Sequence, residues 1–401
     1  MLADSFYASK FYLKQRRSAS ADIIIVMAEK IVSLDIGSST LRAIEAEVKN
    51  KEPKITKIFS MPIPGQIVDA GRILDEKALS EEIARLWKMA KLKANKVIVS
   101  VGGASLQMRV LNDMPWAPAE DFKNMLPFTI RDRVPFEVEE YFYDAHTLIE
   151  QRNPVDLLIY KKILLTAANK TFVNTVVDIL EKNKLKLIAL DALPLTLIRA
   201  HHLTYDYRPN TVVASMDLGA ESFTIMLHKN HQPIHSHIAT GLGGNRVTER
   251  IAKDLKITTP EAELLKTTMG YPAEEVEELT ATVPLPNGMV KTVKVKDFTP
   301  EQVETANQII ADEVALLIAH VNEILDDFFA NSNETTLHEI VLSGGGIMLN
   351  SFIPRLSGEF IPPKIAKPFG EEAGRKVAEE IFNNQHQFMV TLGALVSRNE
   401  Y

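Results

Sequence analysis

The stretch Ile31–Ala46, IVSLDIGSSTLRAIEA, decides the fold that we expect for this chain. It predicts an apolar strand ending in Asp35, a tight turn through Gly37, Ser38 and Ser39, and a second, alternating strand. The turn offers backbone N–H groups and hydroxyls to a phosphate, with no bulky side chain in the way. Because a carboxylate repels a bare phosphate, Asp35 would bind a hydrated divalent cation on that phosphate. Taken alone, the hairpin is explained equally well as an ordinary tight turn.

A second copy of this pattern lies at Val212–Leu227, VVASMDLGAESFTIML. Asp217 ends an apolar strand, and the turn Gly219, Ala220, Glu221, Ser222 leads into another alternating strand. Two such hairpins, about 180 residues apart, predict a duplicated fold in which one loop from each half closes on the same phosphates. Asp217 is therefore predicted, like Asp35, to bind Mg²⁺ through water.

A third glycine-rich loop, IVLSGGGIML, runs from Ile340 to Leu349. Three glycines after a buried strand, Gly344, Gly345 and Gly346, let the backbone approach a flat ligand such as a purine ring, and Met348 follows them. The sequence has no GxxxxGK[ST] motif, which argues against a P-loop site.

Composition narrows the class of protein. With 401 residues and 46% hydrophobic content, the chain can form two or more lobes. A net charge of −7 and the lack of a recognisable nucleic-acid-binding motif argue against a nucleic-acid partner. The chain has no cysteine, and no apolar run approaches the roughly 18 residues that span a bilayer. We expect residues 1–27, which are basic and aromatic, to form a disordered extension; a membrane anchor is the alternative.

The order of the three loops resembles that of the actin-like ATPase superfamily, from Ile31 to Arg398. The resemblance implies an α/β fold with two lobes, a duplicated ribonuclease H-like architecture and a small inserted α+β subdomain. It implies ATP and Mg²⁺ as ligands. The expected division is 28–101 and 166–205 for the first lobe, 102–165 for the insertion, 206–380 for the second lobe, and 381–401 for a helix returning to the first lobe.

Further nucleotide contacts are expected between the second and third loops. The turn ending in Gly243 and Gly244 precedes a helix and can bring N–H donors close to phosphate or ribose. In the segment ITTPEAELLKTTMG, Glu263 and Lys266 match the family's Glu and Lys that flank the ribose and adenine. An exposed ion pair is the alternative for these two residues.

Fast ATP hydrolysis is not expected. Aligned on Pro194, the position where DnaK-type and MreB-type relatives carry a carboxylate is Leu193, which cannot orient water or accept a proton. Asp191 is the nearest acid, and we weigh a water-positioning role for it equally with a structural one. The expected activity is weak or absent.

The insertion resembles that of the PilM family of type IV pilus assembly, through Met114-Pro115 and the corner Val134-Pro135-Phe136. Pro127 departs from the expected helix and should kink or end it. The resemblance implies a cytoplasmic scaffold, peripheral at the inner membrane, that binds the N-terminal cytoplasmic peptide of a PilN-like membrane protein. Contacts with pilus motor ATPases and self-association are further hypotheses from the same resemblance.

Two alternatives stay open. An FtsA-like or MreB-like filament is disfavoured by the Val-Pro-Phe corner and by the absence of the terminal amphipathic helix of FtsA. A sugar-kinase or acetate-kinase type phosphotransferase would need a catalytic acid or base, for which no convincing residue is found. The histidines between His228 and His237 suggest a metal site, but solvated hairpin histidines explain them better.

Overall fold

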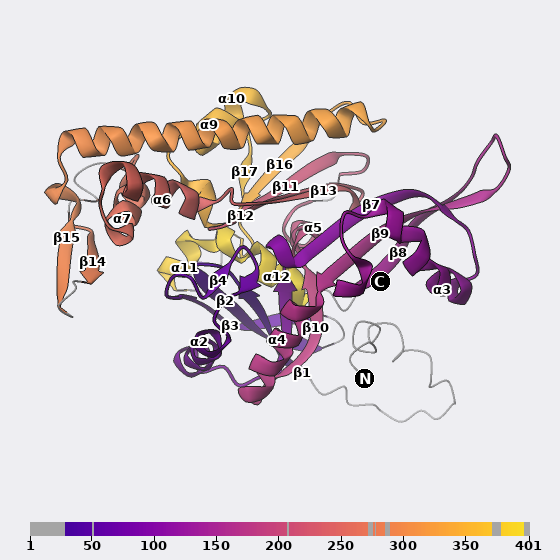
Figure 1. Cartoon of the computed structure of the whole chain (residues 1–401), viewed down its shortest axis with the longest axis horizontal. Helices are drawn as coiled ribbons and strands as arrows, with labels where there is room; N and C mark the ends of the chain where they lie inside the picture. Colours follow the sequence, from indigo (N-terminus) through magenta and orange to yellow (C-terminus); the bar gives the residue numbers. More distant parts are fainter. Residues whose placement is uncertain are drawn as a thin grey trace.

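The computed structural model describes residues 29–49, 52–206, 208–271, 276, 278–284, 289–370 and 378–396. Two five-stranded sheets form its centre, and a three-stranded sheet projects from one side (Figure 1). The predicted extension 1–27 and the last residues of the closing segment, 397–401, lie outside the described residues.

The first sheet has the strand order β10-β6-β1-β2-β3. β1, β2 and β3 are antiparallel neighbours, whereas β6 and β10 run parallel to β1. Its strands are β1 (Glu29–Ile36), β2 (Thr40–Lys49), β3 (Glu52–Pro62), β6 (Lys96–Val101) and β10 (Lys186–Ala192).

The second sheet repeats this topology with the order β13-β12-β11-β16-β17. Three antiparallel strands are again followed by two parallel ones. Its strands are β11 (Val212–Leu218), β12 (Ser222–Lys229), β13 (Gln232–Thr240), β16 (Glu339–Ser343) and β17 (Lys364–Ile365). The duplication predicted from the two hairpins is therefore confirmed.

Successive side chains of a strand point to opposite faces of the sheet, so each sheet packs against two different layers of the molecule. On β1, Val32 and Leu34 pack in the outer core with helices α2 (Glu76–Met89) and α4 (Lys170–Lys182). Ile31, on the other face, packs against the C-terminal helix α12 (Met389–Leu395). Asp35 shares the inner face with Ile31, because it lies an even number of residues further along the strand.

The second lobe is layered in the same way. Its outer core is covered by α6 (Gly244–Leu255), α7 (Thr259–Thr268), α9 (Pro300–Ala330) and α10 (Phe352–Glu359). Its inner face packs on α5 (Leu193–Thr204) and α12. These two helices cross closely, since a Cβ on Gly393 would lie 1.9 Å from the Thr196 carbonyl oxygen. The C-terminal elements thus lie between the two sheets (Figure 1).

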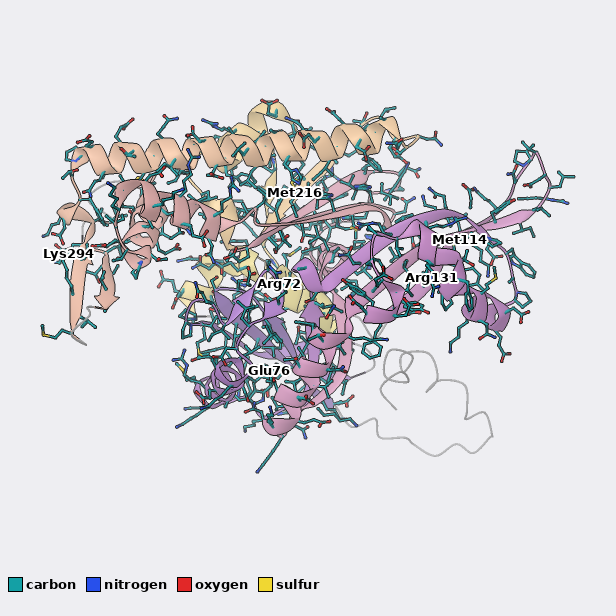
Figure 2. The ribbon with its side chains drawn as sticks, in the orientation of Figure 1. Arg72, Glu76, Met114, Arg131, Met216 and Lys294 are labelled. Carbon is teal, nitrogen blue, oxygen red and sulfur yellow. The ribbon has the colours of Figure 1, made fainter. Side chains whose placement is uncertain are left out.

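The inserted sheet has the order β7-β9-β8, with strands β7 (Leu106–Pro115), β8 (Tyr141–Arg152) and β9 (Ile159–Asn169). Helix α3 (Ala119–Ile130) packs on it through Leu126 and Ile130, against Met114 of β7 (Figure 2). The helix continues past Pro127, so of the two outcomes predicted for this residue, a kink or an end, the end is excluded. Burial of Ile130 holds the last turn in place despite the lost backbone hydrogen bond.

One helix start also differs from expectation. The sequence pattern favours Ser80 as the N-cap, but α2 begins a turn earlier, where Asp75 Oδ1 accepts a hydrogen bond of 2.9 Å from the Ala78 N–H. The remaining elements are β4 (Val68–Asp69), β5 (Arg72–Ile73), β14 (Thr280–Pro284), β15 (Val290–Lys294) and α11 (Glu379–Asn383). None of the helices in the described ranges is long and apolar enough to span a bilayer.

Candidate functional site

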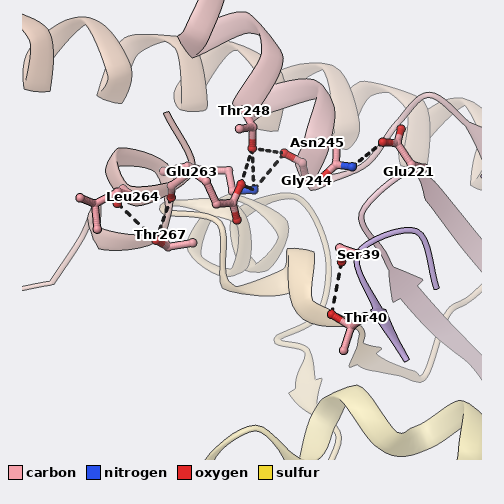
Figure 3. Close-up of polar contacts among 10 residues, drawn as sticks. Ser39, Thr40, Glu221, Gly244, Asn245, Thr248, Glu263, Leu264 and Thr267 are labelled. Carbon is pink, nitrogen blue, oxygen red and sulfur yellow. Dashed lines mark hydrogen bonds and ion pairs between the residues drawn. The ribbon is translucent and has the colours of Figure 1, made fainter. Parts of the chain in front are cut away.

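The two predicted hairpin turns close with the same backbone bond. The Gly37 N–H donates to the Thr40 carbonyl at 3.2 Å, and the Gly219 N–H donates to the Ser222 carbonyl at 2.9 Å. Ser38 Oγ accepts from the Ala70 N–H at 3.1 Å, whereas Ser39 Oγ lies 3.4 Å from the Thr40 hydroxyl (Figure 3). A Cβ on Gly37 would lie 2.8 Å from the Thr40 carbonyl oxygen, so this turn requires glycine.

The two predicted acids occupy equivalent positions in the two sheets. Asp35 of β1 is in register with Ser100 of β6, and Asp217 of β11 is in register with Ser343 of β16. Ser343 Oγ donates to Asp217 Oδ1 at 2.8 Å. Ser100 Oγ is buried and has no hydrogen-bond partner among the described residues.

Burial raises the pKa of both carboxyl groups. The pKa of Asp217 is raised to about 6, mainly by burial and further by the negative charge of Asp35, although Ser343 and Arg42 lower it. Burial also raises the pKa of Asp35, against the opposing effect of the Arg42 guanidinium. Two partly buried acids that repel each other favour a cation between them.

Arg42 is a site residue that the sequence reasoning missed. Its Nη1 donates to Asp35 Oδ2 at 3.2 Å, and its Nη2 donates to Gln387 Oε1 at 2.9 Å. Its Nε is buried and lacks a partner among the described residues. The hairpin register pairs Asp35 with Arg42, so counting residues outward from the turn could have found it.

The predicted turn at Gly243 and Gly244 contacts the second hairpin. The Gly244 N–H donates to the Gly219 carbonyl at 3.0 Å, and the Asn245 N–H donates to the Ala220 carbonyl at 2.8 Å. Asn245 Nδ2 also donates to Glu221 Oε1, and burial raises the Glu221 pKa (Figure 3). The start of α6 and the second hairpin therefore form one unit.

Lys266 fixes helix α7 to the start of α6. Its Nζ donates to the Gly244 carbonyl at 3.1 Å, to Thr248 Oγ1 at 2.8 Å and to Glu263 Oε2 at 2.6 Å (Figure 3). The Lys266 side chain is nearly buried, whereas that of Glu263 is 47% exposed. Glu263 and Lys266 thus form an ion pair, and their contact with a nucleotide stays a prediction. Thr248 is an addition that the sequence did not suggest.

The third predicted loop leaves β16 through a backbone conformation that favours glycine. Gly344 has φ of 85°, and a Cβ on it would lie 2.3 Å from the Leu218 carbonyl oxygen. Gly345 and Gly346 open the short 3₁₀-helix η5 (Gly345–Met348), in which Met348 is 46% exposed. The Gly344 N–H donates to the carbonyl of His386, which belongs to the 3₁₀-helix η7 (Gln385–Phe388), at 3.2 Å.

Asp191 shares a row across the first sheet with Asp35, because both are in register with Ser100. It is buried and forms an ion pair with Arg199, whose Nε donates to the Gly393 carbonyl at 3.2 Å. Arg199 therefore links Asp191 to the crossing of α5 and α12. Leu193 lies beside Gly102, where an added Cβ would be 2.9 Å from Leu193 Cδ1.

Of the four hairpin histidines, His228 is buried and the other three are half-buried, so the preferred interpretation of all four as solvated is wrong for His228. His228 is buried and its Nε2 lies 3.2 Å from Ser215 Oγ, whereas His237 Nε2 lies 3.2 Å from His320 Nε2 of α9. Alternation along the strands showed which residues share a face but not that helices cover both faces. Across the described ranges, no group of three or more His, Cys, Asp or Glu side chains is arranged to hold a metal ion.

Known proteins share this architecture. A solved structure of a PilM-PilN type IV pilus biogenesis complex matches with a TM-score of 0.72 and 20% identity, covering 92% of this chain and 99% of that chain. This match confirms the predicted two-lobed actin-like fold. The cell division protein FtsA of Bacillus subtilis (strain 168) is 24% identical over 321 residues, which are 74% of this chain and 68% of FtsA.

The family model of the type IV pilus assembly protein PilM matches residues 33–297. The match contains the end of β1 with Asp35 and the turn of the first hairpin, the whole inserted sheet, the second hairpin and the Lys266 network. Since it spans well over half of the chain, the protein belongs to the PilM family of type IV pilus assembly proteins.

Proposed function

We propose that this protein is an ATP-binding scaffold of the type IV pilus assembly complex at the cytoplasmic face of the inner membrane. The observation that carries the nucleotide part is the pair of equivalent hairpins, with Asp35 and Asp217 close enough to influence each other's ionisation. Each acid is followed by a tight glycine turn, a kind of backbone that can hold phosphate oxygens.

The residues at the hairpins fit Mg²⁺ and a polyphosphate. Two partly buried carboxyl groups with raised pKa values favour a divalent cation, and the Arg42 Nε–H, which has no partner among the described residues, favours an anion nearby. When bound, the ion would supply the positive charge that Asp35 and Asp217 share. We assign the adenosine to the loop at Gly344–Gly346 and to the face of α7 that carries Glu263 and Lys266.

We propose that hydrolysis is weak or absent. Leu193 stands where related ATPases carry a carboxylate, and the Asp191 carboxylate is engaged by Arg199. The bound nucleotide would then act as a structural ligand that stabilises one arrangement of the two lobes.

The proposed partner is the N-terminal cytoplasmic peptide of a PilN-like membrane protein, bound beside the insertion. Support comes from the match to a PilM-PilN complex over nearly the whole of that chain. The insertion also carries many of the large apolar side chains that the described residues expose, which favours a partner there: Trp116, Phe128, Ile149, Val155, Leu157, Leu158 and Ile159.

A peptide-binding titration tests this proposal. A fluorescently labelled N-terminal cytoplasmic peptide of a PilN-like protein from the same organism is titrated with the protein, with and without Mg-ATP. We expect binding that weakens at least about tenfold in a Trp116→Ala, Phe128→Ala double variant, because exposed aromatic anchors dominate such interfaces. Leu316→Ala, which removes a similarly exposed side chain from α9, is the matched control. Equal binding by the double variant would place the peptide elsewhere.

Filament formation of the FtsA or MreB kind is a second candidate, favoured by the 24% identity to FtsA. Sedimentation with Mg-ATP, with and without the peptide, separates the two functions. A scaffold stays in the supernatant as a complex of fixed stoichiometry, whereas a filament pellets above a critical concentration.

A further inference from the structure

The 3₁₀-helix η7 connects two parts of the proposed nucleotide site that belong to different lobes. On one side, Gln387 Oε1 accepts from Arg42 Nη2 of the first hairpin at 2.9 Å. On the other, the His386 carbonyl accepts from the Gly344 N–H of the third loop. A Cβ placed on Gly345 would lie 3.7 Å from the Gln387 side chain, so this side chain also packs against the third loop.

Gln387 fixes the orientation of the Arg42 guanidinium together with Asp35. Asp35 holds one terminal nitrogen and Gln387 holds the other, so the planar group cannot rotate without breaking a hydrogen bond. This leaves Nε without a partner among the described residues, although it is buried. An unpaired, buried N–H of a cation is costly unless an anionic ligand completes it.

We propose that Gln387 is a positioning residue for the nucleotide site: it orients Arg42 toward the phosphates and joins the first hairpin to the adenosine loop through η7. The inference rests on the proposed nucleotide binding. It assigns to η7 a role in ligand affinity beyond its packing.

The chain offers a matched control within the same helix. Gln385 is buried, and its Oε1 accepts from the Phe369 N–H at 3.1 Å. Gln387→Met removes the bond from Arg42 and a long bond of 3.5 Å from Gln387 Nε2 to Asn384 Oδ1, whereas Gln385→Met removes the bond from Phe369. Both variants keep a similar side-chain volume. Only the first contacts Arg42, so a purely structural role for η7 predicts similar effects of both on binding.

The test is calorimetric titration of Mg-ATP into the full chain and its variants, with thermal unfolding of the ligand-free proteins. We expect Gln387→Met to weaken Mg-ATP affinity about tenfold, the effect of losing one hydrogen bond to a charged group. Gln385→Met should change affinity less than about twofold and act on stability instead. Gln387→Glu, which keeps an acceptor for Arg42, should restore most of the affinity lost in Gln387→Met.

A double-mutant cycle gives the decisive outcome. In an Arg42→Met background, Gln387→Met should lower affinity much less than it does in the parent, because the hydrogen bond between the two side chains is already gone. Additive losses, unchanged affinity in Gln387→Met, or equal losses in both glutamine variants would overturn the inference. If Gln387→Met lowers the unfolding temperature, Gln387→Ala is tested in the same cycle. Absence of Mg-ATP binding by the unmodified protein would instead refute the proposed nucleotide binding itself.

Discussion

Asp35 and Asp217 occupy the same place in two copies of one sheet: each precedes the glycine turn by two residues and is in register with a serine of the neighbouring parallel strand. Their surroundings differ in one respect. Across the hairpin, Asp35 faces Arg42, whereas Asp217 faces Thr224. The first copy therefore carries its own counter-ion, and the second depends on Ser343 and on a ligand.

This asymmetry predicts how nucleotide binding depends on pH. Burial raises the pKa of Asp217 to about 6, and a cation binds the carboxylate rather than the protonated acid. Mg-ATP affinity should therefore rise between about pH 5 and pH 7 and level off above it. Calorimetric titrations across this range check the prediction, and Asp217→Asn should weaken the dependence, leaving only the part that comes from Asp35, whose pKa is also raised. An affinity that falls as the pH rises would contradict it.

The same shift predicts the stability of the ligand-free protein. Because the folded pKa of Asp217 lies above its unfolded value, the carboxyl group's contribution is complete below about pH 4 and is lost as the pH rises through about 6. In urea unfolding, Asp217→Asn should thus gain stability relative to the parent at pH 7 but not at pH 4. A variant that is equally less stable at both values would show that the ionisation of Asp217 does not limit the stability of the parent.

Lys266 should matter for the ligand more than for the fold. We expect Lys266→Met to weaken Mg-ATP affinity about tenfold, because it releases the start of α6 from α7. The unfolding free energy should change by about 1 kcal/mol, since the partner Glu263 is half exposed. Lys253→Ala removes a positive charge at the exposed end of α6 and is the control for charge. Equal losses of Mg-ATP affinity in both variants would argue against a specific role of the contact between Lys266 and the start of α6.

Gly243 should tolerate no side chain. A Cβ there would lie 2.3 Å from the Ala220 carbonyl oxygen, which forces α6 away from the second hairpin. Gly243→Ala should cost about 2 kcal/mol of stability and most of the nucleotide affinity. Gly65→Ala should change neither the stability nor the nucleotide affinity, because no atom of the described residues lies within 4 Å of the new carbon. Circular dichroism and calorimetry on both variants make this comparison.

Gly393 should likewise tolerate no side chain, in this case because it lies at the junction between the two lobes. Its added Cβ would lie 1.9 Å from the Thr196 carbonyl oxygen, at the crossing of α5 and α12. We expect Gly393→Ala to lose about 3–5 kcal/mol in chemical unfolding. Gly358 lies in helix α10, and a Cβ added there would meet no atom of the described residues within 4 Å. Gly358→Ala should therefore be neutral or slightly stabilising, because alanine favours the helix. Similar unfolding curves for the two variants would show that the crossing can relax.

The loops could be predicted from the sequence because each is local. Acid, glycine and alternating strands follow one another within about sixteen residues, so the chain carries the whole signal in one place. The long helix α9 was predictable for the same reason: Thr299 caps it, Pro300 opens it, and its apolar residues recur at helical spacing.

What could not be predicted depends on contacts between distant segments. Arg42 and Gln387 are 345 residues apart, and neither lies in a recognisable motif with the other. His228 stands in a polar stretch but is buried by α5, which the local pattern does not reveal. Asp75 caps α2 in place of Ser80 because the helix begins before its apolar periodicity does.

The central claim is that the two equivalent acids hold a nucleotide with its cation. Its most direct test is calorimetric titration of ATP into the unmodified protein and into Asp35→Ala, each with Mg²⁺ and with EDTA, followed by a steady-state phosphate-release assay. We expect one tight Mg²⁺-dependent site per chain, lost in Asp35→Ala, with negligible turnover. No binding by the unmodified protein, or equal binding by the variant, would contradict the account.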